Sequence, residues 1–425
     1  MRFPAYPNKP AKPKVLTIMW NSLYYGASRR DIVAATPEGT AWHWANPHSG
    51  TQIRGGESVG KSVRSLALLL CIASGAALAT ESGAGAVERL LDESFAGYSE
   101  RGEPGVAVMV IEDGAIRLQQ TYGVADIERR NPITPDTAFR LASVSKQFAA
   151  MAVMILAEEG KLHYDDPVSR FVPELAPYEG VTVRHLLQHT GGLPDYYDVI
   201  DTSNGMPTNQ DAARLLGELA SPEFPPGERY SYSNPGYDML GPLVESASGK
   251  PFVRFVKERI FVPAGMTASL VHDHTLPVVA NRATGYDIVD GEIVEDDADP
   301  LNGIVGSGGI YTTLNDMYRW DQALYGEDLV SRETLELAYT AGVDSRGASI
   351  DYGFGWRIGD YRGHRRVSHG GSWVGFRTHI IRIPDLRFAV VLLSNRGDFD
   401  SDLHANAIVD AWFGEAAAQA LPAGQ

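Results

Sequence analysis

Strand-like segments lie at both ends of the globular part of this chain, and mostly helical patterns lie between them. The apolar run 106–111 predicts a strand, Asp113-Gly114 a hairpin turn, and 115–122 the return strand. Four more strands are predicted near the other end, over 352–358, 365–368, 376–383 and 388–393. We therefore predict an α+β domain: an antiparallel sheet built from both ends of the chain, flanked by helices, beside a mostly helical lobe.

Helical patterns fill the rest of the chain. Apolar residues recur on one side of 87–98, which predicts an amphipathic helix before the first strand. Further helices are predicted over 147–159, 183–189, 212–219, 235–247, 252–260, 313–324 and 405–413. Thr182 is placed to cap the helix 183–189, and His189 at its end is expected to be favoured in its charged form, without a catalytic role.

Composition excludes several classes of function. The chain has 425 residues and a net charge of −16, which argues against nucleic acid and anionic membrane surfaces as partners. Cys71 is its only cysteine, so the sequence excludes an intramolecular disulfide and a cysteine-based metal site. The cluster His272-Asp273-His274 has no third ligand nearby in sequence, so we set a metal hydrolase aside and expect no cofactor.

The first 79 residues do not resemble a folded domain. Residues 1–58 show no sustained period and are predicted to be a non-native upstream or disordered segment. Basic residues, the apolar run 66–73 and an Ala-x-Ala site then predict a signal peptide over 59–79, cleaved after about Ala79. We expect translation to start near Val59, and a periplasmic or secreted hydrolase domain over 85–425. N-terminal sequencing of the native protein tests this, and a mature end well before Ala79 would contradict it.

The chemistry is expected at Ser143-Val144-Ser145-Lys146, where a helix begins. Residues three apart share one helix face, so the Ser143 hydroxyl and the Lys146 amine should meet. A serine hydroxyl needs a base or a positive field to act as a nucleophile, and a desolvated, neutral lysine can be that base. Taken alone, the motif has a simpler reading, in which Ser143 caps the helix and Lys146 is solvated.

Two further motifs could complete such a site. Tyr232-Ser233-Asn234 precedes Pro235, so Asn234 is expected to cap the next helix. A lysine and a helix terminus nearby could lower the pKa of the Tyr232 phenol enough for proton transfer. The third motif, His369-Gly370-Gly371-Ser372, is predicted at the end of an edge strand, where glycines let a substrate backbone approach; a neutral tight turn is the alternative.

Together the three motifs resemble the S-x-x-K, Y-x-N and K/H/W-x-G set of the class C β-lactamase-like family, related to penicillin-binding proteins. That family includes class C β-lactamases, DD-peptidases, D-aminopeptidases and family VIII carboxylesterases. Three other stretches also resemble it: 186–194, 260–266 and 306–311. The resemblance runs from about Val87 to about Phe413 and implies the β-lactamase/transpeptidase-like fold.

The resemblance also implies a role for each motif residue. Ser143 would form an acyl-enzyme, with general acid–base work shared by Lys146 and Tyr232; which of the two takes the serine proton is left open. Substrate would be bound by a second set: Asn234, His369, Gly370, Gly371 and Ser372. The backbone N–H groups of Ser143 and Ser372 would form the oxyanion hole.

One departure from the family pattern bears on the substrate. His369 stands where β-lactamases carry a lysine, and histidine is mostly neutral at pH 7. We therefore expect an exported serine hydrolase acting on esters, or on amides and peptides with D-residues. The alternatives are a β-lactamase proper and a non-catalytic binding protein on the same fold.

Overall fold

The computed structural model describes residues 83–273, 275 and 279–414. The segments predicted as an upstream region, 1–58, and as a signal peptide, 59–79, lie outside these residues. Within the described part, no helix is long and apolar enough to cross a membrane.

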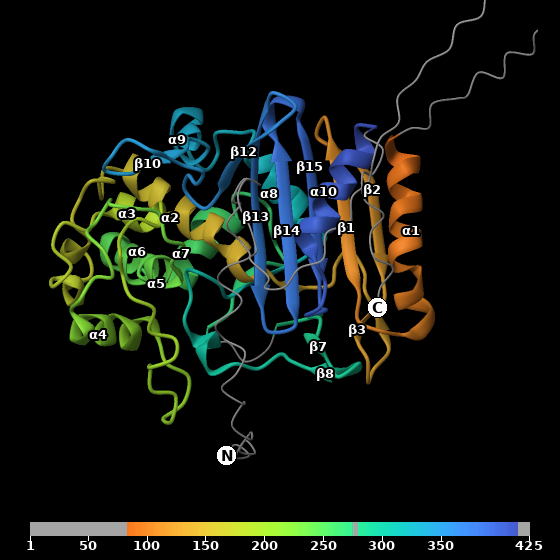
Figure 1. Ribbon diagram of the computed structural model, residues 1–425, viewed down its shortest axis with the longest axis horizontal. Helices are drawn as coiled ribbons and strands as arrows, with labels where there is room; N and C mark the ends of the chain where they lie inside the picture. The colour runs from red at the N-terminus through yellow and green to blue at the C-terminus, as the bar shows by residue number, and fades with distance from the viewer. Residues whose placement is uncertain (1–82, 274, 276–278, 415–425) are drawn as a thin grey trace, which may run out of the picture. The chain divides into compact units, whose positions relative to one another are not determined.

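A six-stranded antiparallel sheet joins the two ends of the domain, as predicted (Figure 1). Its strands, in spatial order, are β12 (Arg357–Tyr361), β13 (His364–Trp373), β14 (Phe376–Ile383), β15 (Phe388–Ser394), β1 (Val106–Glu112) and β2 (Ala115–Tyr122). The N-terminal hairpin therefore pairs with the last strand, with Val106 opposite Ser394 and Glu112 opposite Phe388. The hairpin has the predicted bounds, and Asp113 and Gly114 both adopt the positive φ that its turn requires.

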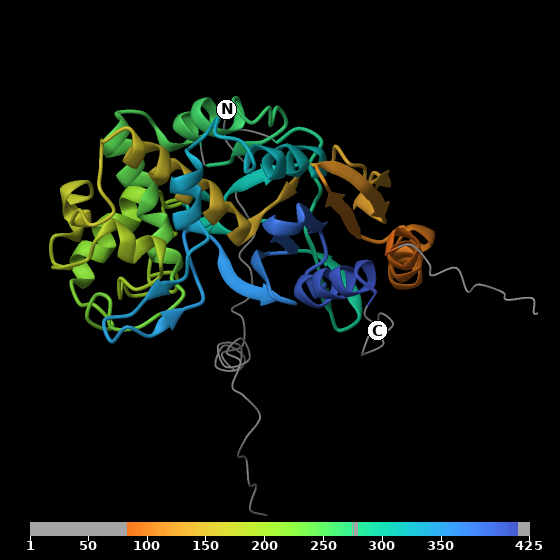
Figure 2. The ribbon, with the colours of Figure 1, turned by 90° about the horizontal axis from the view of Figure 1, so that it is seen from above.

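Helices cover both faces of this sheet (Figure 2). On one face lie α1 (Gly83–Arg101) and α10 (Ser401–Trp412), and on the other lie α2 (Lys146–Glu158) and α8 (Leu314–Ala323). Strand β1 shows how the core divides: Val106, Val108 and Val110 pack with α1 and α10, whereas alternate residues face the larger core around α2. A strand buried on both faces is apolar throughout, which explains the unbroken run 106–111.

The lobe beside β12 is mostly helical, as predicted (Figure 1). It contains α3 (Val183–Leu187), α4 (Asn209–Leu219), α5 (Asn234–Asp238), α6 (Leu240–Ser248) and α7 (Phe252–Val256), with α9 (Arg332–Ala338) nearby. Within the described ranges, short strands form four smaller sheets: β3 (Val124–Asp126) with β4 (Asn131–Pro132); β5 (Phe139–Arg140), β9 (Ile310–Thr312) and β6 (Leu270–Val271); β7 (Tyr286–Val289) with β8 (Glu292–Glu295); and β10 (Gly342–Val343) with β11 (Ser349–Ile350).

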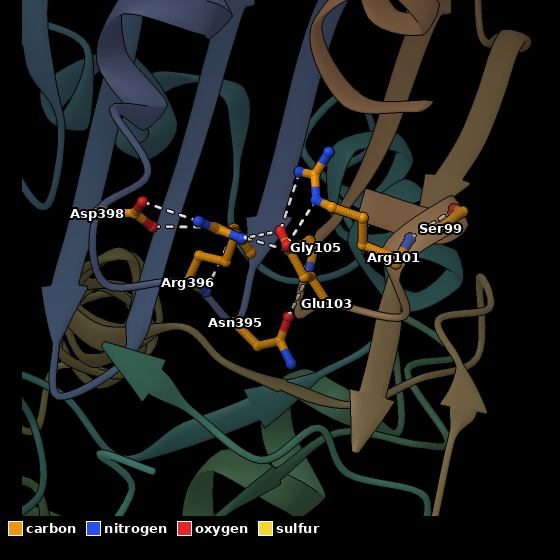
Figure 3. Close-up of polar contacts among 9 residues, drawn as sticks. Ser99, Arg101, Glu103, Gly105, Asn395, Arg396 and Asp398 are labelled. Carbon is orange, nitrogen blue, oxygen red and sulfur yellow. Dashed lines mark hydrogen bonds and ion pairs between the residues drawn. The ribbon is translucent and has the colours of Figure 1, made fainter. Parts of the chain in front are cut away.

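Polar contacts tie the entry of β1 to the exit of β15 (Figure 3). The Arg396 guanidinium lies 3.0 Å from Glu103 Oε2 and 2.9 Å from Asp398 Oδ2. The backbone N–H of Gly105 donates to Asn395 Oδ1 at 2.8 Å. Because Glu103 and Arg396 stand 293 positions apart and Gly105 and Asn395 stand 290 apart, these contacts join the two ends of the domain.

Several predicted boundaries were wrong. The strand expected over 352–358 begins only at Arg357, because Gly353 and Gly355 turn the preceding chain; Gly355 has a φ of +79° and lies against the backbone of Gln147. The helix expected over 235–247 is divided at Met239 into α5 and α6, and the last part of 252–260 is a π-helical turn, Lys257–Phe261. The helix expected over 183–189 ends at Leu187 because His189 adopts a left-handed φ of +57°.

The third motif was also misplaced. His369 does not end an edge strand, because β13 continues to Trp373 and lies second in the sheet. Strand β12 pairs with β13 only as far as Ser368, however. From His369 onward, β13 pairs with β14 alone among the strands of the described residues, so the side of this segment that faces away from β14 is not paired with a strand.

Candidate active site

The backbone before Ser143 is held in an unusual conformation. Ala142 has a φ of +49°, in the left-handed region that costs a residue with a side chain about 1 kcal/mol or more. Ser143 lies in a 3₁₀ turn, Ala142–Ser145, that leads directly into α2 at Lys146. Residues i and i+3 lie one above the other in a 3₁₀ turn, so the side chains of Ser143 and Lys146 meet where α2 begins.

Lys146 is fully buried and joins the first two motifs. Its Nζ lies 3.2 Å from Ser143 Oγ, 2.7 Å from Asn234 Oδ1 and 3.1 Å from the carbonyl oxygen of Ser307. These three acceptors are neutral. Burial lowers the pKa of Lys146 to about 7, against an opposing effect of the Asp238 carboxylate and with a further lowering by Arg357. A lysine with this pKa is largely deprotonated just above neutral pH and can accept the proton of Ser143.

Asn234 is free for this contact because Ser233 caps the helix in its place. The Ser233 hydroxyl accepts from the backbone N–H of Gly236 at 3.1 Å, and Asn234 is the first residue of α5. The prediction that Asn234 is the cap was therefore wrong by one residue. The shift turns its amide oxygen towards Lys146.

Tyr232 lies close to both Ser143 and Lys146, but its pKa moves opposite to our expectation. Burial raises the pKa of the phenol, and a hydrogen bond with Ser143 and the charge of Arg357 offset this only in part. Lys146 Nζ lies 4.8 Å from the centre of the Tyr232 ring, over its face. A protonated tyrosine can donate a proton and a neutral lysine can accept one, so the opposite pKa shifts of the two groups are compatible with Lys146 as a base and Tyr232 as an acid.

His369 lies beside Tyr232 and is buried rather than exposed to the site. Its Nδ1 lies 2.7 Å from the carbonyl oxygen of Gly370, which can only accept, so Nδ1 carries the proton. Nε2 then accepts from the Tyr352 hydroxyl at 2.9 Å. Burial, together with Arg357 and Lys146, holds the pKa of His369 well below its ordinary value. The third motif therefore provides a neutral imidazole, as its sequence predicted.

One glycine of the third motif, Gly371, is required for packing within the protein. A Cβ on Gly371 would collide with the carbonyl oxygen of Leu141, two residues before the nucleophile. Thr378 on the neighbouring strand donates to the same oxygen at 2.7 Å. Gly371 thus lets β13 lie against the Ser143 turn, a role within the fold that the sequence did not predict. Beyond it, Ser372 lines the same hollow as Ser143 and Asn234.

Sequence reasoning missed a polar network beneath Lys146. Ser307 Oγ lies 3.3 Å from the Tyr197 hydroxyl, which donates to Asp238 Oδ2 at 3.1 Å. Tyr196 donates to the same oxygen at 2.7 Å. Burial raises the pKa of Asp238 to about 6 against these hydrogen bonds and the charge of Lys146. The stretch 306–311 was noted only as a family resemblance, and Asp238 had no signal because it follows the second motif inside a helix.

His189 was also assigned the wrong charge state. It is 1% exposed, and its ring lies 4.4 Å from that of Tyr232. The backbone N–H of Ser233 donates to its Nδ1 at 3.0 Å. Burial and the nearby Lys146 hold its pKa well below the ordinary value, so it is neutral and orders the second motif.

No group of three or more metal-ligating side chains occurs among the residues with described positions. Of the cluster His272-Asp273-His274, the third residue lies outside that set, and His272 packs against Tyr311 with ring centres 5.6 Å apart.

A serine hydroxyl, a buried lysine whose pKa is lowered and a tyrosine whose pKa is raised thus lie together, an arrangement that could support acyl transfer. Comparison with known proteins agrees with this chemistry. A family model described as Beta-lactamase matches residues 85–411, so the chain belongs to the beta-lactamase family.

Two curated proteins show the relationship in more detail. The chain is 36% identical over 322 residues to penicillin-binding protein 4* of Bacillus subtilis, covering 72% of this chain and 71% of that protein. It is 31% identical over 301 residues to a D-aminopeptidase of Brucella anthropi, covering 69% of this chain and only 56% of that protein.

Solved structures share the fold. A penicillin-binding protein homologue from Pyrococcus abyssi, described as octameric, superposes with a TM-score of 0.69 at 30% identity, covering 80% of this chain and 79% of that one. A penicillin-binding protein from Bacillus halodurans gives a TM-score of 0.64 at 27% identity, covering 76% of this chain and 98% of that one.

Proposed function

We propose that this chain is an exported serine hydrolase that forms an acyl-enzyme on Ser143 and acts on esters, or on amides and peptides with D-residues. The observation that carries the proposal is the 3.2 Å contact between Ser143 Oγ and the amine of Lys146, whose pKa burial lowers to about 7. Similarity to a D-aminopeptidase supports the D-residue class, and the predicted signal peptide over 59–79 supports export.

The steps follow from the positions of the protons. Lys146 accepts the proton of Ser143 while the serine oxygen bonds to the acyl carbon. The backbone N–H groups of Ser143 and Ser372 are proposed to stabilise the negative oxygen, at roughly 3–4 kcal/mol per donor. Tyr232 protonates the leaving group as its bond to the acyl carbon breaks, and Lys146 returns its proton to the tyrosine. Water then releases the acyl group from Ser143 with the same base.

The third motif argues against efficient hydrolysis of β-lactams. A fixed positive charge there would bind the carboxylate of a β-lactam, but His369 is neutral and both ring nitrogens have partners within the protein. This favours substrates without a carboxylate beside the leaving group.

The test compares kcat/KM for a p-nitrophenyl ester, a D-alanyl p-nitroanilide and a chromogenic cephalosporin, with Ser143→Ala as the blank. We expect turnover of the ester or the anilide that disappears in the blank, with little turnover of the cephalosporin. Fast cephalosporin turnover would identify a β-lactamase, and no turnover of any substrate would favour a non-catalytic binding protein.

A further inference from the structure

A second buried cation, Arg140, lines the hollow that contains Ser143. It lies in β5, three residues before the nucleophile, and pairs with Tyr311 of β9. Its side chain is almost fully buried, with the residue 3% exposed, and its guanidinium carbon lies 5.7 Å from the centre of the Tyr311 ring. The hollow is also lined by Ser143, Asn234, Ser307, Ser372 and Trp373.

Two donor nitrogens of the Arg140 guanidinium are left unmatched by protein groups. Its buried Nε and Nη1 have no hydrogen-bond acceptor among the described residues. Arg282 provides the contrast: it lies over the same Tyr311 ring at 5.0 Å, but it forms an ion pair with Asp297 and donates to a backbone carbonyl. Buried donors without an acceptor are unfavourable, so retaining them at the edge of the hollow that contains Ser143 points to a ligand that matches them.

The position of Arg140 indicates which half of a substrate it would contact. The proposed proton donor to the leaving group, Tyr232, does not line this hollow; it lies with His369 and Arg357. The leaving group therefore belongs on the Tyr232 side of Ser143. The hollow with Arg140 then receives the acyl half, beside the oxyanion donors proposed for Ser143 and Ser372.

We propose that Arg140 binds a carboxylate carried by the acyl part of the substrate, so that the enzyme prefers acidic acyl groups such as D-aspartyl or succinyl. The planar guanidinium matches a carboxylate with two parallel hydrogen bonds, and burial strengthens them. Long-range attraction does not explain the preference for acidic acyl groups, because the chain has a net charge of −16 and repels anions at a distance. This inference rests on the proposed function, since it assigns the acyl specificity of the same site.

The experiment compares isosteric substrate pairs on the full chain. One pair is p-nitrophenyl hemisuccinate and p-nitrophenyl succinamate; the other is the p-nitroanilides of D-aspartate and D-asparagine. The readout is the ratio of kcat/KM for the carboxylate to kcat/KM for the carboxamide, corrected with the Ser143→Ala blank. Taking this ratio cancels differences in the fraction of active protein.

We expect a ratio well above one in the wild type and at least a tenfold lower ratio in Arg140→Gln. The ratio for Arg140→Lys should fall between these two values, because lysine keeps the positive charge but lacks the paired N–H donors of the guanidinium. Arg282→Gln, on the same tyrosine ring, should keep the wild-type ratio.

A wild-type ratio at or below one overturns the inference, even if Arg140→Gln cannot be produced in folded form. An equal loss on both members of a pair in Arg140→Gln overturns it as well, because it makes the arginine structural. Turnover of neither member of either pair contradicts the proposed function itself, which is a different outcome from turnover without preference.

Discussion

Two regions of the described domain each bury a cation completely, and these two cations have very different partners. At the contact between β14 and α8, Arg382 is fully buried; its Nε lies 2.6 Å from Asp321 Oδ1, and its Nη1 lies 2.5 Å from the Tyr339 hydroxyl. Burial opposes its charge, but Tyr339 and Asp321 outweigh this and raise its pKa. At the active site, Lys146 is just as buried, but its direct partners are neutral oxygens.

The partners of a buried cation decide whether it stabilises the fold or can take part in proton transfer. A buried cation that is paired directly with a carboxylate keeps its charge and joins two elements of the fold. A buried amine that is given only neutral acceptors gives up its proton near neutral pH and becomes a base. The carboxylate of Asp238 is instead hydrogen-bonded to Tyr196 and Tyr197, and it acts on Lys146 through its charge.

The largest effect is expected from removing the catalytic amine. Lys146→Met should lower kcat/KM about 10³- to 10⁴-fold, because the serine loses its base. The free energy of unfolding should stay the same or rise, since a desolvated amine is replaced by an apolar side chain of similar length. Steady-state kinetics and urea unfolding measure both quantities. A loss in rate below tenfold would assign the base elsewhere.

The ion pair between Arg382 and Asp321 should respond in the opposite way, since breaking it should lower the free energy of unfolding. Asp321→Asn leaves the charge of Arg382 buried without its carboxylate and should lower the free energy of unfolding by about 3–5 kcal/mol. Urea unfolding measures this loss. The double variant Asp321→Leu with Arg382→Met is the control and should recover most of it. If Asp321→Asn lowered the free energy of unfolding by less than about 1 kcal/mol, the proposed contrast between the Arg382 and Lys146 regions would be contradicted.

A smaller effect is expected on the pH profile. The neutral form of Lys146 is the active one, so kcat/KM should rise with pH through about 7. Asp238 raises the pKa of Lys146 and Arg357 lowers it. Asp238→Asn should therefore move the rise to lower pH, and Arg357→Met should move it to higher pH. Shifts in the same direction for both variants would contradict this electrostatic assignment.

The smallest effect is expected where a cation pairs in solvent. Arg170 lies 2.8 Å from Asp166, four residues earlier, with its side chain 55% exposed. Arg170→Ala should change the free energy of unfolding by no more than about 0.5 kcal/mol, because water and salt screen such pairs. Thermal unfolding at low and high salt measures it, and a loss above 2 kcal/mol would show that burial is not what distinguishes these cations.

The sequence predicted the sheet well because its pattern is local. The hairpin at 106–122 and the strand at 376–383 have their predicted bounds, since apolar runs and turn residues define them without reference to the rest of the chain. The strand expected from Tyr352 failed because the chain bends at Gly353 and Gly355, which lie against the backbone of Ala338 and Gln147, contacts that only the tertiary structure forms.

The candidate site, like the sheet, could be predicted from the sequence only where the signal is local. Ser143 and Lys146 could be joined from their spacing, and Asn234 lies with them as the motifs implied. The direction of the Tyr232 pKa shift could not be predicted, because it depends on burial by distant residues. Arg140 stands in an ordinary apolar sequence, and only the pairing of β5 with β9 places it at the hollow.

The most direct test of this account is the rate at which a fluorophosphonate labels Ser143 as a function of pH, with the adduct located by mass spectrometry. We predict a single adduct on Ser143, formed at a rate that rises through about pH 7 to a plateau and that falls sharply in Lys146→Met. No adduct in the folded protein, an adduct on another residue, or a rate that is constant across this pH range would contradict a serine nucleophile activated by a neutral lysine.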